Sequence, residues 1–215
     1  MCGRFLLLSE VRDLMNYYSI ENQTLDKYES GDFYPSKNTP IVLNKNKRSI
    51  SYAKWGFPYS NKKGLVINAR ADSIMNKPMF KNSFYNRRCV IPSNLFYEWK
   101  DEGARKKIKY KIGLQHDKLM SLGGIYKISL DENMKEQLTY VIITTEATED
   151  LKLIHPRMPL IIKNDKLDLW LNEGTSIKLI QEILKHNVNH LFIVEKHTDA
   201  TETIKDNIHG QIGLF

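Results

Sequence analysis

Short segments in which apolar and polar residues alternate fill the middle of the chain. Alternation with a period of two is typical of strands that bury one face, and turn-forming residues separate these segments from one another. The pattern predicts strands at about 40–44, 48–57, 65–68, 87–91, 95–100, 107–114, 119–128 and 137–144. The segment 21–39 is polar and rich in turn-forming residues, so we interpret it as a turn-rich connection.

Helical spacing of apolar residues occurs mostly outside this strand-rich middle. A first helix, capped by Ser9, is predicted to run to about Tyr18. Further elements are predicted as short helices at about 71–76 and 79–85, a helix at 146–152 behind Thr145, helices near 165–172 and 176–186, and strands near 159–162 and 190–194. Because strands dominate the middle and helices lie around them, we predict the α+β class. No segment has the composition of a linker, so residues 1–215 are expected to form a single domain with one core.

The composition is that of an ordinary globular protein. Of the 215 residues, 41% are hydrophobic and 27% are charged, and a chain of this length can bury a substantial core. The two cysteines, Cys2 and Cys89, make no disulfide framework and fit a reducing cytosol. No apolar run approaches the roughly 20 residues of a membrane helix. We therefore expect a cytoplasmic protein that does not enter a membrane.

Positive charge is concentrated in the first half of the chain. Residues 1–111 hold 21 Lys and Arg against 10 Asp and Glu, a net charge of +11, within a total of +7. Residues 112–215 hold 11 Lys and Arg against 15 Asp and Glu, a net charge of −4. This polarity favours a polyanionic partner such as nucleic acid for the first half. A solvated, lysine-rich surface is the alternative explanation.

The second residue of the chain is a cysteine, and this position gives it unusual chemistry. Removal of Met1 would leave Cys2 with a thiol and a free α-amine on adjacent carbons. An ordinary thiol has a pKa of about 8.5 and an α-amine one of about 7.7–8.0, so part of the amine is unprotonated at neutral pH. The amine can condense with an aldehyde to a Schiff base, and the thiol can then close a five-membered thiazolidine. Retention of Met1, with an inert Cys2, is the alternative.

A second candidate segment lies at the end of a predicted strand. Asn68 and Arg70 are two residues apart, so they share one face of that strand. An amide and a guanidinium side by side suit a sugar and its phosphate. The alternative is a plain turn at the strand end, in which Asp72 or Ser73 caps the next helix, and for those two residues we favour capping.

Two further segments carry candidate acid–base groups. Glu98 lies between aromatic residues in a strand pattern, and partial desolvation there would raise its pKa and suit it to proton transfer. His155 is held before a proline, with Arg157 nearby, where it can act as an acid or a base near neutral pH. A solvated edge-strand glutamate and a structural histidine are the respective alternatives.

Other residues have less decided roles. Arg4 could bind a phosphate or pair with a carboxylate, and Trp55 could stack on a base or lie in the core. Cys89 lies in an apolar strand pattern and is interpreted as core filler. His186 and His190 have helical spacing but no evident third ligand, so no metal site is predicted.

Six sequence strings resemble the SRAP family (SOS response-associated peptidase domain), whose members are abasic-site sensors that crosslink to DNA. The strings are MCGRF, KWGFP, INARADS, RRCVIPSNLFYEWK, TTEA and IHPRMPLII, and they span roughly residues 1–171 in the family's order. One string would be weak evidence, whereas six in order are specific. The resemblance implies a compact α+β fold built around an open, barrel-like sheet with peripheral helices. It also implies a positively charged cleft for single-stranded DNA.

The resemblance further implies a role for each matching residue. Cys2, freed by removal of Met1, would join the ring-opened aldehyde of an abasic site as a thiazolidine that shields the lesion. Asn68 would hold the opened sugar, Glu98 would move protons, and His155 would assist opening of the sugar. DNA contacts are expected from Arg4, Trp55, Arg70 and Arg157. A monomer associated with the nucleoid is expected, without cofactor, and with possible lyase and Met1-removing peptidase activity.

Two positions depart from the family pattern. Leu95 stands where family members usually carry glycine, and residues 33–36 match poorly to an Arg/Tyr-Asn-x-Ala-Pro stretch. Neither departure touches the four residues to which chemistry is assigned.

Two other functions are compatible with the same residues. One is a thiol peptidase or amidohydrolase in which Cys2 is an N-terminal nucleophile. The other is a non-covalent single-stranded DNA-binding module in which Cys2 is inert.

Overall fold

The computed structural model describes residues 2–21, 28–59, 61–103, 106–131, 133–185 and 192–197. Its strands are β1 (Phe5–Leu7), β2 (Gly31–Phe33), β3 (Asn38–Asn44), β4 (Arg48–Trp55), β5 (Phe57–Pro58), β6 (Leu65–Val66), β7 (Asn68–Arg70), β8 (Arg88–Ser93), β9 (Leu95–Asp101), β10 (Lys107–Leu114), β11 (Met120–Leu130), β12 (Glu136–Glu146), β13 (Arg157–Pro159), β14 (Ile161–Ile162) and β15 (Phe192–Lys196). Its helices are α1 (Val11–Tyr17), α2 (Pro78–Asn86), α3 (Glu149–Lys152), η1 (Asn164–Lys166), α4 (Leu167–Leu171) and α5 (Ile177–Lys185). None of the helices in these residues is long and apolar enough to cross a membrane.

The centre of the fold is a closed barrel. Strands β4, β3, β8 and β11 follow one another, and β12 pairs with both β11 and β4, which closes the ring. The β12–β4 contact is parallel and joins Thr139 to Lys54 and Tyr140 to Trp55. Strand β12 then continues past β4 and pairs with β7 and β13. One strand therefore links the barrel to two segments that carry candidate site residues.

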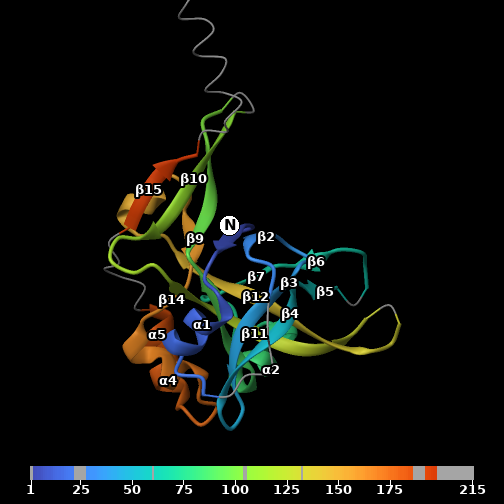
Figure 1. The fold of residues 1–215 in the computed structure, drawn as a ribbon. Coiled ribbons are helices and arrows are strands. Elements are labelled where there is room, and N and C mark those ends of the chain that lie inside the picture. Colours follow the sequence, from blue (N-terminus) through green and yellow to red (C-terminus); the bar gives the residue numbers. More distant parts are fainter. Residues whose placement is uncertain are drawn as a thin grey trace, which may run out of the picture.

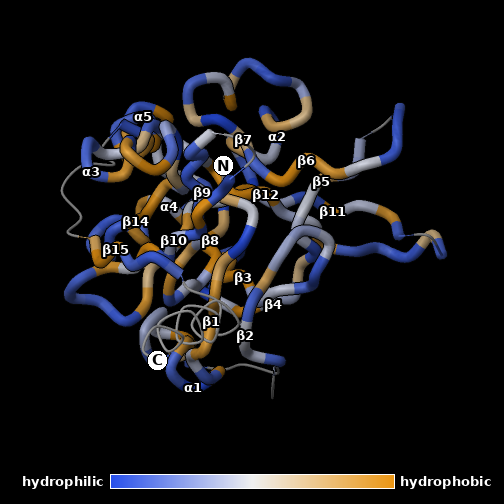
Figure 2. Tube along the Cα trace, turned by 90° about the horizontal axis from the view of Figure 1, so that it is seen from above, coloured by the Kyte–Doolittle hydropathy of each residue, from blue (hydrophilic) through white to orange (hydrophobic). Residues whose placement is uncertain are grey.

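A second sheet packs against the barrel. Its strand order is β15-β10-β9-β1-β2, so β1 lies between β9 and β2. Phe5 of β1 lies opposite Phe33 on one side and Phe96 on the other, and all three are buried. In Figures 1 and 2 the start of β1 lies near β7, β9 and β12. The fold thus brings the beginning of the chain to the junction of the two sheets.

Helices cover the barrel on one side. Helices α2 and α4 contact β8, and every residue of β8 is buried because the barrel interior and these helices cover its two faces. Figure 2 shows the same distribution, with hydrophobic segments along the inner strands and hydrophilic ones in the outer loops. Burial on both faces explains why the strand reads as a nearly continuous apolar run.

A pair of glycines permits close packing on β11. A Cβ on Gly124 would lie 2.5 Å from Ile91 Cδ1 and 2.9 Å from the Val141 carbonyl oxygen. Both neighbours belong to strands that flank β11, and the carbonyl is backbone that cannot rotate away. Glycine is therefore required where β8, β11 and β12 approach one another most closely.

The strand-rich α+β class with peripheral helices is confirmed, with three corrections to individual elements. The barrel is closed rather than open, because the pairing of β12 on both sides could not be inferred from local patterns. The segment 21–39 contains a strand, β2, which is only three residues long and pairs with the equally short β1. The short helix expected at 71–76 is a series of turns.

Cap positions also differ from expectation. The N-cap of helix α1 is Glu10 rather than Ser9, and the Glu10 N–H donates to Asp13 Oδ2 at 3.3 Å. Helix α3 begins behind Thr148 rather than Thr145, because β12 extends to Glu146. The last strand runs from Phe192 to Lys196, and the start of the expected strand, like the end of the chain, lies outside the described residues.

Candidate functional site

Cys2 is fixed in the protein interior just before β1. Its side chain is completely buried, and the thiol lies 4.0 Å from the Arg4 carbonyl oxygen. The Tyr97 N–H donates to that same carbonyl at 2.9 Å, which anchors the first residues to β9. The candidate nucleophile therefore has a defined position rather than a mobile one.

Asn68 reaches Cys2 from the other sheet. Strand β7 runs parallel to β12, with Asn68 opposite Ile142, and this register directs the amide toward the start of the chain. Asn68 Nδ2 donates to the Cys2 carbonyl oxygen at 2.9 Å. Asn68 Oδ1 is buried and accepts no hydrogen bond within the described residues. The amide thus holds the backbone of Cys2 and offers an acceptor to a hydroxyl or amine.

Glu98 contributes a buried carboxyl group to the same place. It lies on β9 opposite Tyr110 and is only 3% exposed. Burial raises the pKa of Glu98 above its ordinary value, and the nearby His155 works in the opposite direction. Burial and then the charge of Glu98 raise the pKa of the Cys2 thiol. The thiol is therefore protonated at neutral pH, and Glu98 lies near enough for its charge to act on the sulfur.

His155 follows α3 in a turn that fixes its imidazole. His155 Nδ1 lies 3.0 Å from the Arg157 N–H nitrogen and 2.9 Å from the Arg157 carbonyl oxygen. A neutral Nδ1 can accept from the N–H, and a protonated Nδ1 can donate to the carbonyl. The turn therefore holds the ring in one position with Nδ1 as either donor or acceptor, which suits a residue that gives and takes a proton.

Two of the predicted DNA-binding arginines lie together beside this group. Asp72 Oδ2 accepts from Arg70 Nη2 at 2.8 Å, from Arg70 Nε at 3.1 Å and from Arg157 Nη1 at 3.3 Å. Arg157 also donates through Nη2 to the Thr144 carbonyl at 2.5 Å. Asp72 therefore joins the arginines instead of capping a helix, and the favoured capping interpretation is wrong. Helix α2 begins behind Lys77 without a side-chain cap.

Arg4 immediately precedes β1 and has other partners than Arg70 and Arg157. Its Nη2 pairs with Asp32 Oδ2 at 2.6 Å, and its guanidinium lies 5.5 Å from the centre of the Tyr97 ring. Lys109 Nζ lies 4.1 Å from the same ring centre. Burial, followed by the neighbouring Asp32, raises the pKa of Tyr97 to about 12. Asp32 and Tyr97 were not singled out in the sequence, because their contact with Arg4 depends on the pairing of β1 with β2 and β9.

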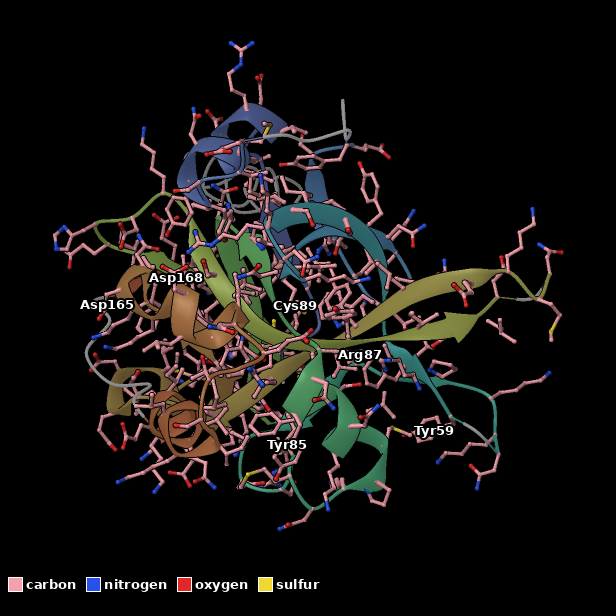
Figure 3. All side chains as sticks on the ribbon, turned by 90° about the horizontal axis from the view of Figure 1, so that it is seen from below. Tyr59, Tyr85, Arg87, Cys89, Asp165 and Asp168 are labelled. Carbon is pink, nitrogen blue, oxygen red and sulfur yellow. The ribbon has the colours of Figure 1, made fainter. Side chains whose placement is uncertain are left out.

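Trp55 is not available to DNA in this structure. Its side chain is completely buried, its Nε1 donates to the Ile67 carbonyl at 3.0 Å, and it stacks on Tyr140. The prediction that it stacks on a base is therefore wrong, and the core alternative holds. Cys89 is likewise completely buried, as its interpretation as core filler requires. Figure 3 shows Cys89 in the interior of the ribbon.

The structure thus assembles four predicted residues, Cys2, Asn68, Glu98 and His155, at the junction of the two sheets. A family model described as SOS response associated peptidase (SRAP) matches residues 1–199. The chain belongs to the SRAP family. The match includes all of the described residues of this SRAP protein.

Several curated proteins are similar to this SRAP chain. The abasic site processing protein YoaM of Bacillus subtilis is 34% identical over 194 residues, which cover 86% of this chain and 85% of YoaM. The abasic site processing protein HMCES of Xenopus tropicalis is 26% identical over 200 residues, with 74% of this chain and 60% of HMCES covered. The abasic site processing protein YedK of Escherichia coli is 24% identical over 192 residues, with 85% of each chain covered.

Solved structures support the SRAP fold. A crystal structure of a protein from Bacteroides thetaiotaomicron superposes with a TM-score of 0.79 at 24% identity and covers 94% of both chains. A second, from Bordetella bronchiseptica, superposes with a TM-score of 0.75 at 14% identity and covers 92% of this chain and all of the other. At these identities the likeness concerns the fold alone.

Proposed function

We propose that this protein captures abasic sites in single-stranded DNA covalently, through Cys2 after removal of Met1. The observation that carries the proposal is the burial of Cys2 beside Asn68, Glu98 and His155. The relatives named abasic site processing proteins support the lesion as the substrate. The net positive charge of residues 1–111 supports DNA as the partner. The protein would act as a monomer on chromosomal DNA in the cytoplasm.

The reaction begins at the α-amine of Cys2. The amine adds to the aldehyde carbon of the ring-opened sugar, and loss of water leaves a Schiff base. The thiol then adds to the same carbon: the S–C bond forms, C=N becomes a single bond, and the thiol proton reaches the nitrogen. The overall step releases water and needs no oxidant or reductant. The thiazolidine keeps the aldehyde from eliminating the neighbouring phosphate.

The surrounding side chains each suit one part of this sequence. The thiol of Cys2 is protonated at neutral pH, so ring closure needs a base, and the Glu98 carboxylate is the adjacent one. The imidazole of His155 protonates the sugar oxygen as the ring opens, since its turn accepts both protonation states. Asn68 Oδ1 accepts from the liberated hydroxyl, because it is buried and accepts no other bond within the described residues.

DNA contacts come from the cations around the site. Arg70 and Arg157 share Asp72, whereas Arg4 is held separately by Asp32, and the strand would contact both cationic positions. The proposal includes two side reactions of the same residues. One is removal of Met1, and the other is cleavage of the strand when the Schiff base loses the neighbouring phosphate by β-elimination.

The test is a denaturing gel of the protein with a single strand that carries one abasic site. We expect a band of low mobility that withstands heat and denaturant, and no such band with an intact strand of the same sequence. Mass spectrometry of the free protein should show that Met1 has been removed. Absence of the band from protein that lacks Met1 would contradict covalent capture and would favour a peptidase or a plain binding module.

Replacement of Glu98 by glutamine should slow crosslink formation by about 10²–10⁴-fold, the usual contribution of a general acid–base group. The rate of the wild-type protein should show an ionisation above the ordinary glutamate value of about 4.3, because burial raises the pKa of Glu98. This ionisation should be absent from the pH–rate profile of Glu98→Gln. Stopped crosslinking reactions at several pH values provide the measurement.

The same substitution has a predicted effect on stability. Since the folded-state pKa of Glu98 is raised, the stability that its bound proton provides is complete below the unfolded pKa and is lost as the pH rises through the folded value. Glu98→Gln should therefore not lower Tm at neutral pH.

Glu102→Gln, a substitution of a more exposed carboxylate on the same hairpin, is the control for the crosslinking rate and should leave that rate unchanged. A wild-type rate in Glu98→Gln would remove Glu98 from the mechanism.

A further inference from the structure

A single carboxylate oxygen joins two guanidinium groups at the edge of the site. Asp72 Oδ2 accepts from Arg70 at 2.8 and 3.1 Å and from Arg157 at 3.3 Å. The two cations lie close enough that the charge of Arg70 contributes, after burial, to lowering the pKa of Arg157. An anion between them relieves this repulsion. Asp72 is therefore placed where an oxygen of a DNA phosphate would be bound by both arginines.

The two arginines are not equally held. The side chain of Arg157 is 12% exposed and is fastened to β12 through the Thr144 carbonyl, whereas the side chain of Arg70 is 56% exposed. Asp72 is itself 48% exposed and comes only two residues after Arg70. The Arg70–Asp72 pair is thus a local, solvent-exposed ion pair, which a competing anion can open at small cost. Arg157 keeps its place in either case.

We propose that Asp72 is a specificity-determining residue that competes with DNA phosphate for Arg70 and so weakens binding of undamaged single strands. Selectivity is a difference of affinities, and it improves when the binding of the wrong ligand is weakened. An intact strand depends on phosphate contacts alone, whereas an abasic strand is also held by its covalent bond to Cys2. The competition therefore penalises the intact strand more. This inference rests on the proposed function, since it concerns the same DNA-binding surface.

The test measures equilibrium binding of an intact, fluorescent single strand at several salt concentrations. Asp72→Asn should bind about two- to fivefold more tightly than the wild type at low salt, the range that loss of an exposed ion pair allows. Its plot of log affinity against log salt should be steeper by about 0.7, the value for one more neutralised phosphate. Asp72→Ser removes the same charge with a smaller side chain and should behave alike.

Two controls separate this competition from a general charge effect. Asp165→Asn changes the net charge by the same amount as Asp72→Asn. Asp165 is also an exposed carboxylate in an ion pair, with Lys166, but it lies near α4 on the helical side of the molecule (Figure 3). It should leave affinity and salt dependence unchanged. In an Arg70→Ala background, Asp72→Asn should tighten binding much less, because only the weaker contact of Asp72 with Arg157 at 3.3 Å remains to be released.

Each alternative outcome has a definite meaning. Unchanged or weaker binding by both Asp72 variants would overturn the inference and would make Asp72 a residue that positions the arginines. Equal tightening by Asp165→Asn, or undiminished tightening in the Arg70→Ala background, would also overturn it. The crosslink of the wild type to an abasic strand is scored separately. A normal crosslink with unresponsive Asp72 variants would refute this inference and leave the proposed function standing.

Discussion

Replacement of Cys2 by alanine should abolish the heat-stable crosslink to an abasic strand completely. The thiazolidine needs both the amine and the thiol of the same residue, and alanine retains only the amine. A Schiff base can still form, but it hydrolyses when the complex is denatured. We therefore expect no shifted band from Cys2→Ala on a denaturing gel, and a restored band when borohydride is added during the reaction to reduce the Schiff base.

The matched control is the other cysteine. Cys89 is also completely buried but lies on β8, where its carbonyl accepts from the indole of Trp170 at 2.8 Å. Cys89→Ala should crosslink as the wild type does. Non-covalent binding of an intact strand should be similar in all three proteins, because neither sulfur is a phosphate ligand. A heat-stable band from Cys2→Ala without borohydride would refute thiazolidine formation at Cys2.

Replacement of Arg88 by alanine should lower the free energy of unfolding by about 3–5 kcal/mol. Arg88 is 3% exposed and donates to the carbonyls of Phe84, Tyr85, Trp170 and Asn172 at 2.6–2.9 Å. These carbonyls belong to the ends of α2 and α4, where a cation is favourable and where carbonyls lack partners of their own. Loss of the guanidinium removes this donor from the carbonyls of Phe84, Tyr85 and Trp170, and leaves the Asn172 carbonyl with only the Thr175 N–H at 3.1 Å.

Thermal unfolding provides the measurement. For a protein of this size, the loss corresponds to a fall in Tm of roughly 6–20 °C. Arg88→Lys should recover only part of the stability, since a single ammonium cannot reach both helix ends with the geometry of a guanidinium. Arg87→Ala is the control, because Arg87 is the adjacent residue and is partly exposed; Figure 3 labels Arg87. Equal losses in Arg87→Ala and Arg88→Ala would contradict the argument.

Much of the strand pattern could be predicted from local sequence. The strand Lys107–Leu114 was expected with the same bounds, because its alternation is regular and turn-forming residues flank it. The strands β1 and β2 were not expected, since three residues are too few to show a period. Closure of the barrel depends on strands far apart in sequence, and no local pattern encodes it.

The candidate site divides in a similar way. Cys2 stood out because removal of Met1 would give it a free amine beside its thiol, and Glu98 stood out because a polar residue in an apolar context is costly unless it has a role. The environment of Trp55 could not be predicted, because an aromatic residue at a strand end fits either a core or a stacking surface. The contacts of Asp72 were missed for another reason. Its sequence neighbours favour a cap, and its partner Arg157 is brought to it only through β12.

The arrangement of β12 has a consequence for the newly made chain. Cys2 is synthesised well before His155 and before β12, the strand that holds Asn68 in place. Until β12 has joined the barrel and holds β7 in place, the pocket around the thiol is incomplete, and an exposed cysteine has an ordinary pKa of about 8.5. A nascent or partly unfolded chain is therefore the form most open to oxidation. Completion of the fold buries the thiol and raises its pKa.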